Sequence, residues 1–152
     1  SYFTYWGPES YGGLYQDGKP SPLLRDVTVL NAEIEKLGPA LLELESMAVH
    51  HTAPLPYGTE AAPADAPARV VGGGSFAIGL FGQKGQAAAF MVVNRSYKEE
   101  ATAEVKVSIA GPRLEELDRA TGRWSPGPEL GPERTAKLRL RPGDGRLLRA
   151  RP

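Results

Sequence analysis

The stretch Gln86-Ala-Ala-Ala-Phe-Met-Val-Val-Asn-Arg-Ser96 decides which fold this chain can adopt. Its apolar run is too short to cross a membrane, and it ends in turn-forming residues, as a buried strand does. The segments that follow Ala68 have the features of strands that can pair with this run or pack over it. The sequence therefore predicts a β-rich domain with residues 86–96 at its centre.

The segments on either side of this run alternate between apolar and polar residues and are separated by turn formers. Residues 75–82 lead into Gly82-Gln83-Lys84-Gly85, which favours a hairpin turn into the central run. Residues 101–109 alternate strictly, which indicates a half-buried strand with one wet face. Further strand and turn signals lie at 114–118, 120–122, 123–124, 135–141, 142–145 and 146–150. We expect a mainly β fold, an antiparallel β-sandwich of about six to eight strands.

The N-terminal part of the chain has a different character. Residues 1–6, Ser-Tyr-Phe-Thr-Tyr-Trp, are aromatic or β-branched at nearly every position, which favours a strand that is buried on both faces. A glycine-rich loop follows, and Ser21-Pro22 then supplies a good N-cap with proline at the first helical position. We expect a helix to begin there.

This helix is expected to be long and amphipathic. Its apolar residues recur at alternating steps of four and three and form one stripe: Leu23, Val27, Leu30, Ile34, Leu37, Leu41, Leu44 and Ala48. Such a stripe must be buried against another element. Gly38-Pro39 interrupts the helix, because proline removes a backbone donor and clashes with the preceding turn, so we expect a kink or two helices in series.

These patterns divide the chain into three parts. Residues 1–49 form a strand, loop and helix, residues 50–67 form a proline-rich connector, and residues 68–152 form the sandwich. The pair His50-His51 raises the question of a metal site. Neighbouring histidines point in different directions in a helix or strand, and no nearby carboxylate has a suitable spacing, so we expect no metal site.

The amino-acid composition of the chain limits the classes of binding partner and cofactor that we expect. Lys+Arg and Asp+Glu both number 18, so the net charge is zero and no overall field attracts nucleic acid or a membrane. No segment has the ~18 consecutive apolar residues of a membrane span, and the absence of cysteine excludes thiolate metal sites and disulfides. Gly72-Gly73-Gly74 has no following helix to bind phosphate, so we expect no nucleotide cofactor, and nothing indicates another cofactor.

The order of these segments resembles the end of bacterial glycoside hydrolases. It is similar to the last β/α unit of a (β/α)8 catalytic barrel followed by a C-terminal sandwich, as in family 42 β-galactosidases. The resemblance rests on the aromatic strand at 2–6, Asp17-Gly18-Lys19-Pro20, and the helix with Leu30-Asn31-Ala32-Glu33-Ile34 and Leu37-Gly38-Pro39. It rests also on Val92-Val93-Asn94-Arg95, Asp118-Arg119-Ala120-Thr121-Gly122 and Leu140-Arg141-Pro142-Gly143-Asp144-Gly145.

The resemblance implies a location for two substrate-binding residues. Trp6 would lie at the C-terminal end of the eighth barrel strand, where such enzymes place an aromatic platform against the sugar ring. The alternative is that Trp6 belongs to the core beneath the helix. Glu9, in the loop that follows, would contact the substrate. The two catalytic carboxyl groups are expected upstream of Ser1, so we assign no catalytic residue to this chain and expect no hydrolysis by it alone.

Three functions follow from these patterns. The first is an accessory, structural region of a glycoside hydrolase, whose partner is the upstream catalytic barrel of the same chain. The second is a carbohydrate-binding module with Trp124, Tyr97 or Tyr57 as stacking residues. The third is a dimerisation domain, because an unpaired apolar strand and a lone amphipathic helix can pair with a second copy.

Overall fold

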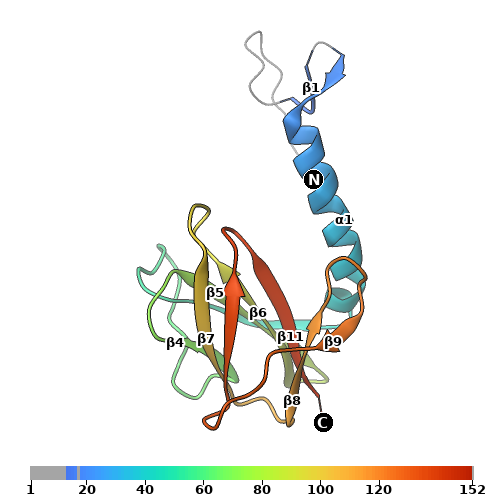
Figure 1. Ribbon diagram of the computed structural model, residues 1–152. Coiled ribbons are helices and arrows are strands. Elements are labelled where there is room, and N and C mark those ends of the chain that lie inside the picture. Colours follow the sequence, from blue (N-terminus) through green and yellow to red (C-terminus); the bar gives the residue numbers. More distant parts are fainter. Residues whose placement is uncertain (1–12, 17, 152) are drawn as a thin grey trace.

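The computed structural model describes residues 13–16 and 18–151, which form two antiparallel sheets packed face to face and one long helix (Figure 1). The prediction of a mainly β sandwich preceded by a helix is therefore confirmed. The aromatic segment 1–6 and the two predicted substrate-binding residues, Trp6 and Glu9, lie outside the described residues.

Nine strands of the described chain build the two layers of the sandwich. The larger sheet has the order β3-β5-β6-β11-β8-β9, and the smaller sheet has the order β10-β7-β4. The strands of the larger sheet are β3 (Glu45–His51), β5 (Phe76–Gln83), β6 (Gln86–Asn94), β11 (Gly145–Arg151), β8 (Arg113–Leu117) and β9 (Trp124–Pro126). Those of the smaller sheet are β10 (Thr135–Leu140), β7 (Ala101–Val107) and β4 (Ala68–Val71). A separate two-stranded ribbon, β1 (Tyr15–Gln16) with β2 (Lys19–Pro20), precedes the helix.

Strand β6 lies inside the larger sheet, as its sequence predicts. It pairs with β5 on one side and with β11 on the other, so Phe90 lies opposite both Leu80 and Leu148. The hairpin between β5 and β6 turns at Lys84 and Gly85, whose φ values are 53° and 75°. Two central residues with positive φ favour a tight hairpin that follows the twist of the strands. The predicted turn at 82–85 is thus confirmed.

The main core lies between the two sheets, and all the buried residues that form it are apolar. Each strand contributes alternate residues, because successive side chains of a strand point to opposite faces. The buried residues of this core are Ala68, Phe76, Ile78, Leu80, Phe90, Val92, Ala103, Val105, Val107, Ile109, Leu114, Ala136, Leu138, Leu140 and Leu148. They include the inward positions that the sequence predicts for residues 101–109 and 135–141.

A buried asparagine fixes the end of β6 to two neighbouring loops. Asn94 is 1% exposed, and its Nδ2 donates to the carbonyl oxygens of Glu99 at 2.8 Å and Arg141 at 3.0 Å. Its Oδ1 accepts from the backbone N–H of Ser96 at 3.0 Å. One side chain therefore holds the β6–β7 loop and the β10–β11 turn together.

The helix α1 (Pro22–Leu42) begins where the sequence predicts, with Ser21 as its N-cap residue. It is one helix through Gly38-Pro39, so the alternative of two helices in series is wrong. Pro39 lies within the last turn of α1, where the loss of one intrahelical bond removes little of the helix. Figure 1 shows the N-terminal half of α1 extending beyond the end of the sheets.

The C-terminal boundary of the helix differs from the prediction. The stripe was expected to continue through Leu44 to Ala48, but α1 ends at Leu42, and Ala48 belongs to β3 and packs against the main core. The backbone of β3 pairs with β5, which overrides the helical spacing of its apolar residues. His50-His51, assigned by sequence to the connector, also lies in β3, and residues 52–67 contain no helix or strand.

Candidate functional site

The three predicted stacking residues of a carbohydrate-binding module lie on different elements. Trp124 begins β9, at one edge of the larger sheet. Tyr57 follows β3, the strand at the opposite edge, and Tyr97 lies in the loop after β6. Tyr57 and Tyr97 are fully or largely exposed, whereas Trp124 is half-buried. The structure therefore provides no common aromatic platform from these three residues.

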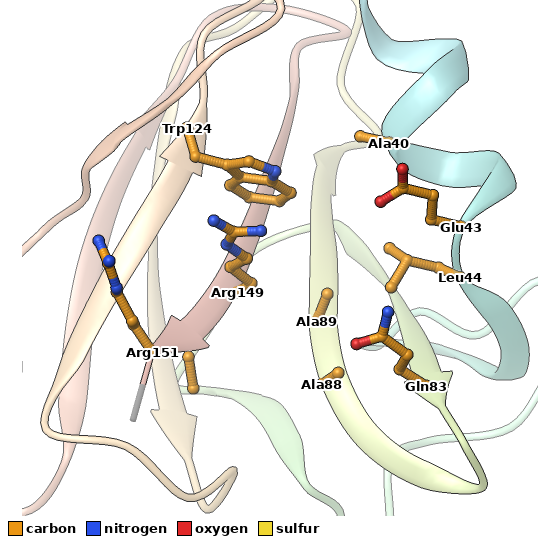
Figure 2. A pocket seen from close by; sticks show the side chains of 10 residues that line it. Ala40, Glu43, Leu44, Gln83, Ala88, Ala89, Trp124, Arg149 and Arg151 are labelled. Carbon is orange, nitrogen blue, oxygen red and sulfur yellow. The ribbon is translucent and has the colours of Figure 1, made fainter.

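A pocket of about 270 Å³ lies beside Trp124, between the end of α1 and the outer face of the larger sheet (Figure 2). It forms because the C-terminal part of α1 packs on this face. Leu37, Leu41 and Leu44 contact a small second core, whose buried members are Ala89, Leu117 and Leu147. Next to this contact the outer face of the sheet carries the short side chains of Ala88 and Ala89, which leave an open space.

One wall of the pocket is a stacked and hydrogen-bonded group on β8, β9 and β11. The guanidinium carbon of Arg149 lies 4.2 Å from the centroid of the Trp124 ring, which is a cation–π contact. Arg149 also donates to Oε2 of Glu115, from Nε at 2.9 Å and from Nη2 at 2.7 Å. Arg151 donates from Nη1 to Oε1 of the same carboxylate at 2.7 Å. Glu115 thus holds two arginines in place.

This wall is a consequence of strand register. Arg149 and Glu115 are direct partners across β11 and β8, and directly opposite residues have neighbouring side chains on one face. The hydrogen bond from Arg149 lowers the pKa of Glu115, partial burial opposes this effect, and Arg151 lowers the pKa further. Glu115 therefore stays ionised, and the position of Arg149 under the indole ring is fixed. The sequence does not predict this group, because the pairing of Arg149 with Glu115 depends on a strand register that alternation alone does not give.

The opposite wall consists of polar groups without partners. Figure 2 shows the Gln83 amide and the Glu43 carboxylate across the pocket from Trp124 and Arg149. Within the part of the chain that the structure describes, neither side chain makes a hydrogen bond or ion pair, and the same holds for Nε1 of Trp124. The pocket is therefore surrounded by hydrogen-bonding groups that remain available.

The two histidines of β3 line a second pocket, of about 210 Å³. The Nδ1 atoms of His50 and His51 are buried and have no hydrogen-bond partner in the described structure. Successive residues of a strand point to opposite faces, so the two rings do not converge on one point. Among residues 13–16 and 18–151, no group of three His, Cys, Asp or Glu side chains could hold a metal ion.

We found no helix in the described ranges with the length and apolar character of a membrane span. A scan against protein-family models matched no family, and comparison with curated proteins and with solved structures gave no match.

Proposed function

We propose that this chain is the C-terminal accessory region of a glycoside hydrolase and that α1 joins the sandwich to the catalytic domain. The observation that carries the proposal is the way the apolar stripe of α1 is covered. Its C-terminal residues Leu37 and Leu41 pack on the second core. Its N-terminal residues Leu30 and Ile34, which continue the stripe, are 49% and 58% exposed.

The exposed half of the stripe supports an interdomain role for the helix. A surface helix normally buries one continuous apolar face, and each Å² of apolar surface that leaves water contributes about 25 cal/mol. Leu23, in the first turn of α1, is also exposed, whereas Val27, between Leu23 and Leu30 on the stripe, is buried, so the open part of the face is interrupted at one position. An apolar helix face that packs on the sandwich near its C-terminal end and is exposed to solvent further toward its N-terminus can contact a second domain.

The glycosidase assignment rests on the resemblance of the sequence, which implies that the catalytic carboxyl groups lie upstream of this chain. A retaining glycosidase needs two carboxyl groups about 5–5.5 Å apart at one site. Four pockets of the described residues can be compared, and none has more than one carboxylate in its lining. The proposed contribution of this region is therefore stability and orientation of the catalytic domain.

A matched pair of substitutions tests the interdomain role in the polypeptide that includes the upstream sequence. Ile34→Glu places a charge on the stripe, whereas Val29→Glu places it on another face of α1, and Val29 is 59% exposed. We expect Ile34→Glu to lower the melting temperature of the long polypeptide by several degrees and Val29→Glu to leave it unchanged. Equal effects of the two substitutions would contradict the proposal.

The same pair distinguishes a homodimer from an interdomain contact. If the stripe pairs with a second copy, light scattering of the 152-residue chain will give the mass of a dimer, and Ile34→Glu will reduce it to that of a monomer. Our proposal predicts a monomer for both forms at low concentration.

A further inference from the structure

The geometry points to a binding site for one ring of a neutral sugar in the pocket between α1 and the outer face of the larger sheet. This site is distinct from the exposed stripe of α1, and it does not depend on the proposed role of that helix. Its ligand class follows from three properties of the pocket: the donors on one wall, the acceptors on the other, and the floor between them.

The wall on β9 and β11 offers only donors to a ligand. The indole Nε1 of Trp124 is a donor without acceptor capacity, and Figure 2 shows it on the ring edge that faces the pocket. Arg149 uses Nε and Nη2 for Glu115, which leaves Nη1 without a hydrogen bond within the described chain. Because Glu115 neutralises much of the charge of Arg149 and Arg151, this wall donates hydrogen bonds without strongly selecting an anion.

The opposite wall is mainly an acceptor. The Glu43 carboxylate accepts only, and the Gln83 amide both accepts and donates. Glu43 is the C-cap residue of α1, and the last carbonyl groups of a helix lack intrahelical partners and carry partial negative charge. No basic residue occupies the last turn of α1 to offset this charge.

These two walls select a ligand that both donates and accepts. A carboxylate or phosphate would be repelled by Glu43 and the helix end, and an ammonium group, which only donates, would find no acceptor on the wall of Trp124 and Arg149. A neutral hydroxyl group accepts from one wall and donates to the other, and adjacent hydroxyl groups of a pyranose do this in pairs. The methyl groups of Ala88 and Ala89 on the floor suit the C–H face of such a ring.

The size of the pocket limits the ligand to about one ring. Drug-sized ligands occupy pockets of roughly 300–1,000 Å³, and this pocket measures about 270 Å³. One face of the Trp124 ring is covered by Arg149, so recognition relies on the edge of the indole rather than on stacking against that face.

Titration of the 152-residue chain with monosaccharides, followed by ¹H–¹⁵N NMR, tests the site. The indole N–H resonance of Trp124 is identified by its loss in Trp124→Phe. We expect this resonance to shift in a saturable way with at least one of galactose, glucose and mannose. Glucuronate and glucosamine, which add a negative and a positive charge, should bind more weakly. An oligosaccharide that binds no better than its terminal sugar would indicate recognition of a single ring.

Two glutamine variants provide the control. Gln83→Ala should weaken the binding of the sugar about tenfold, as expected when a hydrogen-bonding group is removed. Gln86 lies opposite Gln83 in the same hairpin but does not line the pocket, so Gln86→Ala should leave the affinity unchanged. The proposal is overturned if no neutral sugar gives a saturable shift, if a charged analogue binds best, or if Gln83→Ala binds as tightly as the unsubstituted chain.

Discussion

Asn94 shows how one polar side chain stabilises a junction between loops. It is the largest buried polar group of the core region and satisfies carbonyl groups on two separate loops. We expect Asn94→Ala to lower the free energy of unfolding by about 2–3 kcal/mol, because the carbonyl groups of Glu99 and Arg141 lose their buried donor. Urea denaturation measures this change. Gln86→Ala, at an exposed position, is the control, and similar losses in the two variants would contradict the assigned role.

Glu115 should show an acid-shifted titration that depends on Arg149. The hydrogen bond from Arg149 lowers the pKa of Glu115 in the folded chain. A carboxyl group with a lowered folded pKa stabilises the fold above its unfolded pKa, and this contribution disappears as the pH falls through the folded pKa. Arg149→Met should therefore raise the pKa of Glu115 toward its ordinary value, as followed by ¹³C NMR of the carboxyl carbon.

The control for this titration is an arginine that does not contact the carboxylate. Arg123 lies in the exposed part of the β8–β9 hairpin, and Arg123→Met should leave the pKa of Glu115 where it is. An unchanged pKa in Arg149→Met would mean that the hydrogen bond across β8 and β11 does not set the charge of this wall.

At the scale of elements, the β8–β9 hairpin sets the distance between α1 and the sandwich. Gly122 has a φ of +69°, and a Cβ atom there would lie 3.3 Å from the carbonyl oxygen of Lys36 in α1. Arg119, in the same hairpin, forms ion pairs with Glu33 of α1 at 3.3 Å and with Asp144 at 2.7 Å. The hairpin therefore contacts α1 through its backbone at Gly122 and through the ion pair of Arg119 with Glu33.

A pair of glycine substitutions separates this helix contact from backbone strain. Gly143 has a φ of +66°, and its Cβ would meet nothing within 4 Å. Gly143→Ala should therefore lower the free energy of unfolding by about 1 kcal/mol, the cost of placing alanine at a positive φ. Gly122→Ala should cost more, because it also pushes against α1. Thermal unfolding of the two variants measures the difference, and equal losses would show that α1 does not rest on this hairpin.

Alternation predicted most strands of the sandwich, and the Ser21-Pro22 signal predicted the start of α1, whereas the helical spacing of apolar residues did not predict its end. Residues 135–141 have an unambiguous period of two, and the structure confirms their inward positions. Leu44 and Ala48 continue the spacing of the helix, yet the chain leaves the helix at Leu42 and Ala48 packs in the main core. Residues 45–51 form a strand because they pair with the edge of β5, and the local sequence does not indicate that this edge is available.

At the scale of the whole molecule, the candidate site was only partly predictable. Trp124 could be selected from the sequence as a candidate stacking residue, and it does line the pocket. Its neighbours come from α1, β5, β6 and β11, so the site depends on how the helix crosses the sheet. Tyr57 and Tyr97, the alternative stacking residues, lie on other elements and do not line this pocket.

The proposed accessory role makes a direct prediction about the gene. The most direct measurement is the nucleotide sequence upstream of the Ser1 codon in the source genome. We predict that the reading frame continues upstream through alternating strand and helix segments and includes two carboxylate residues at the ends of barrel strands. A start codon immediately before Ser1 would contradict the claim that this chain is part of a glycoside hydrolase.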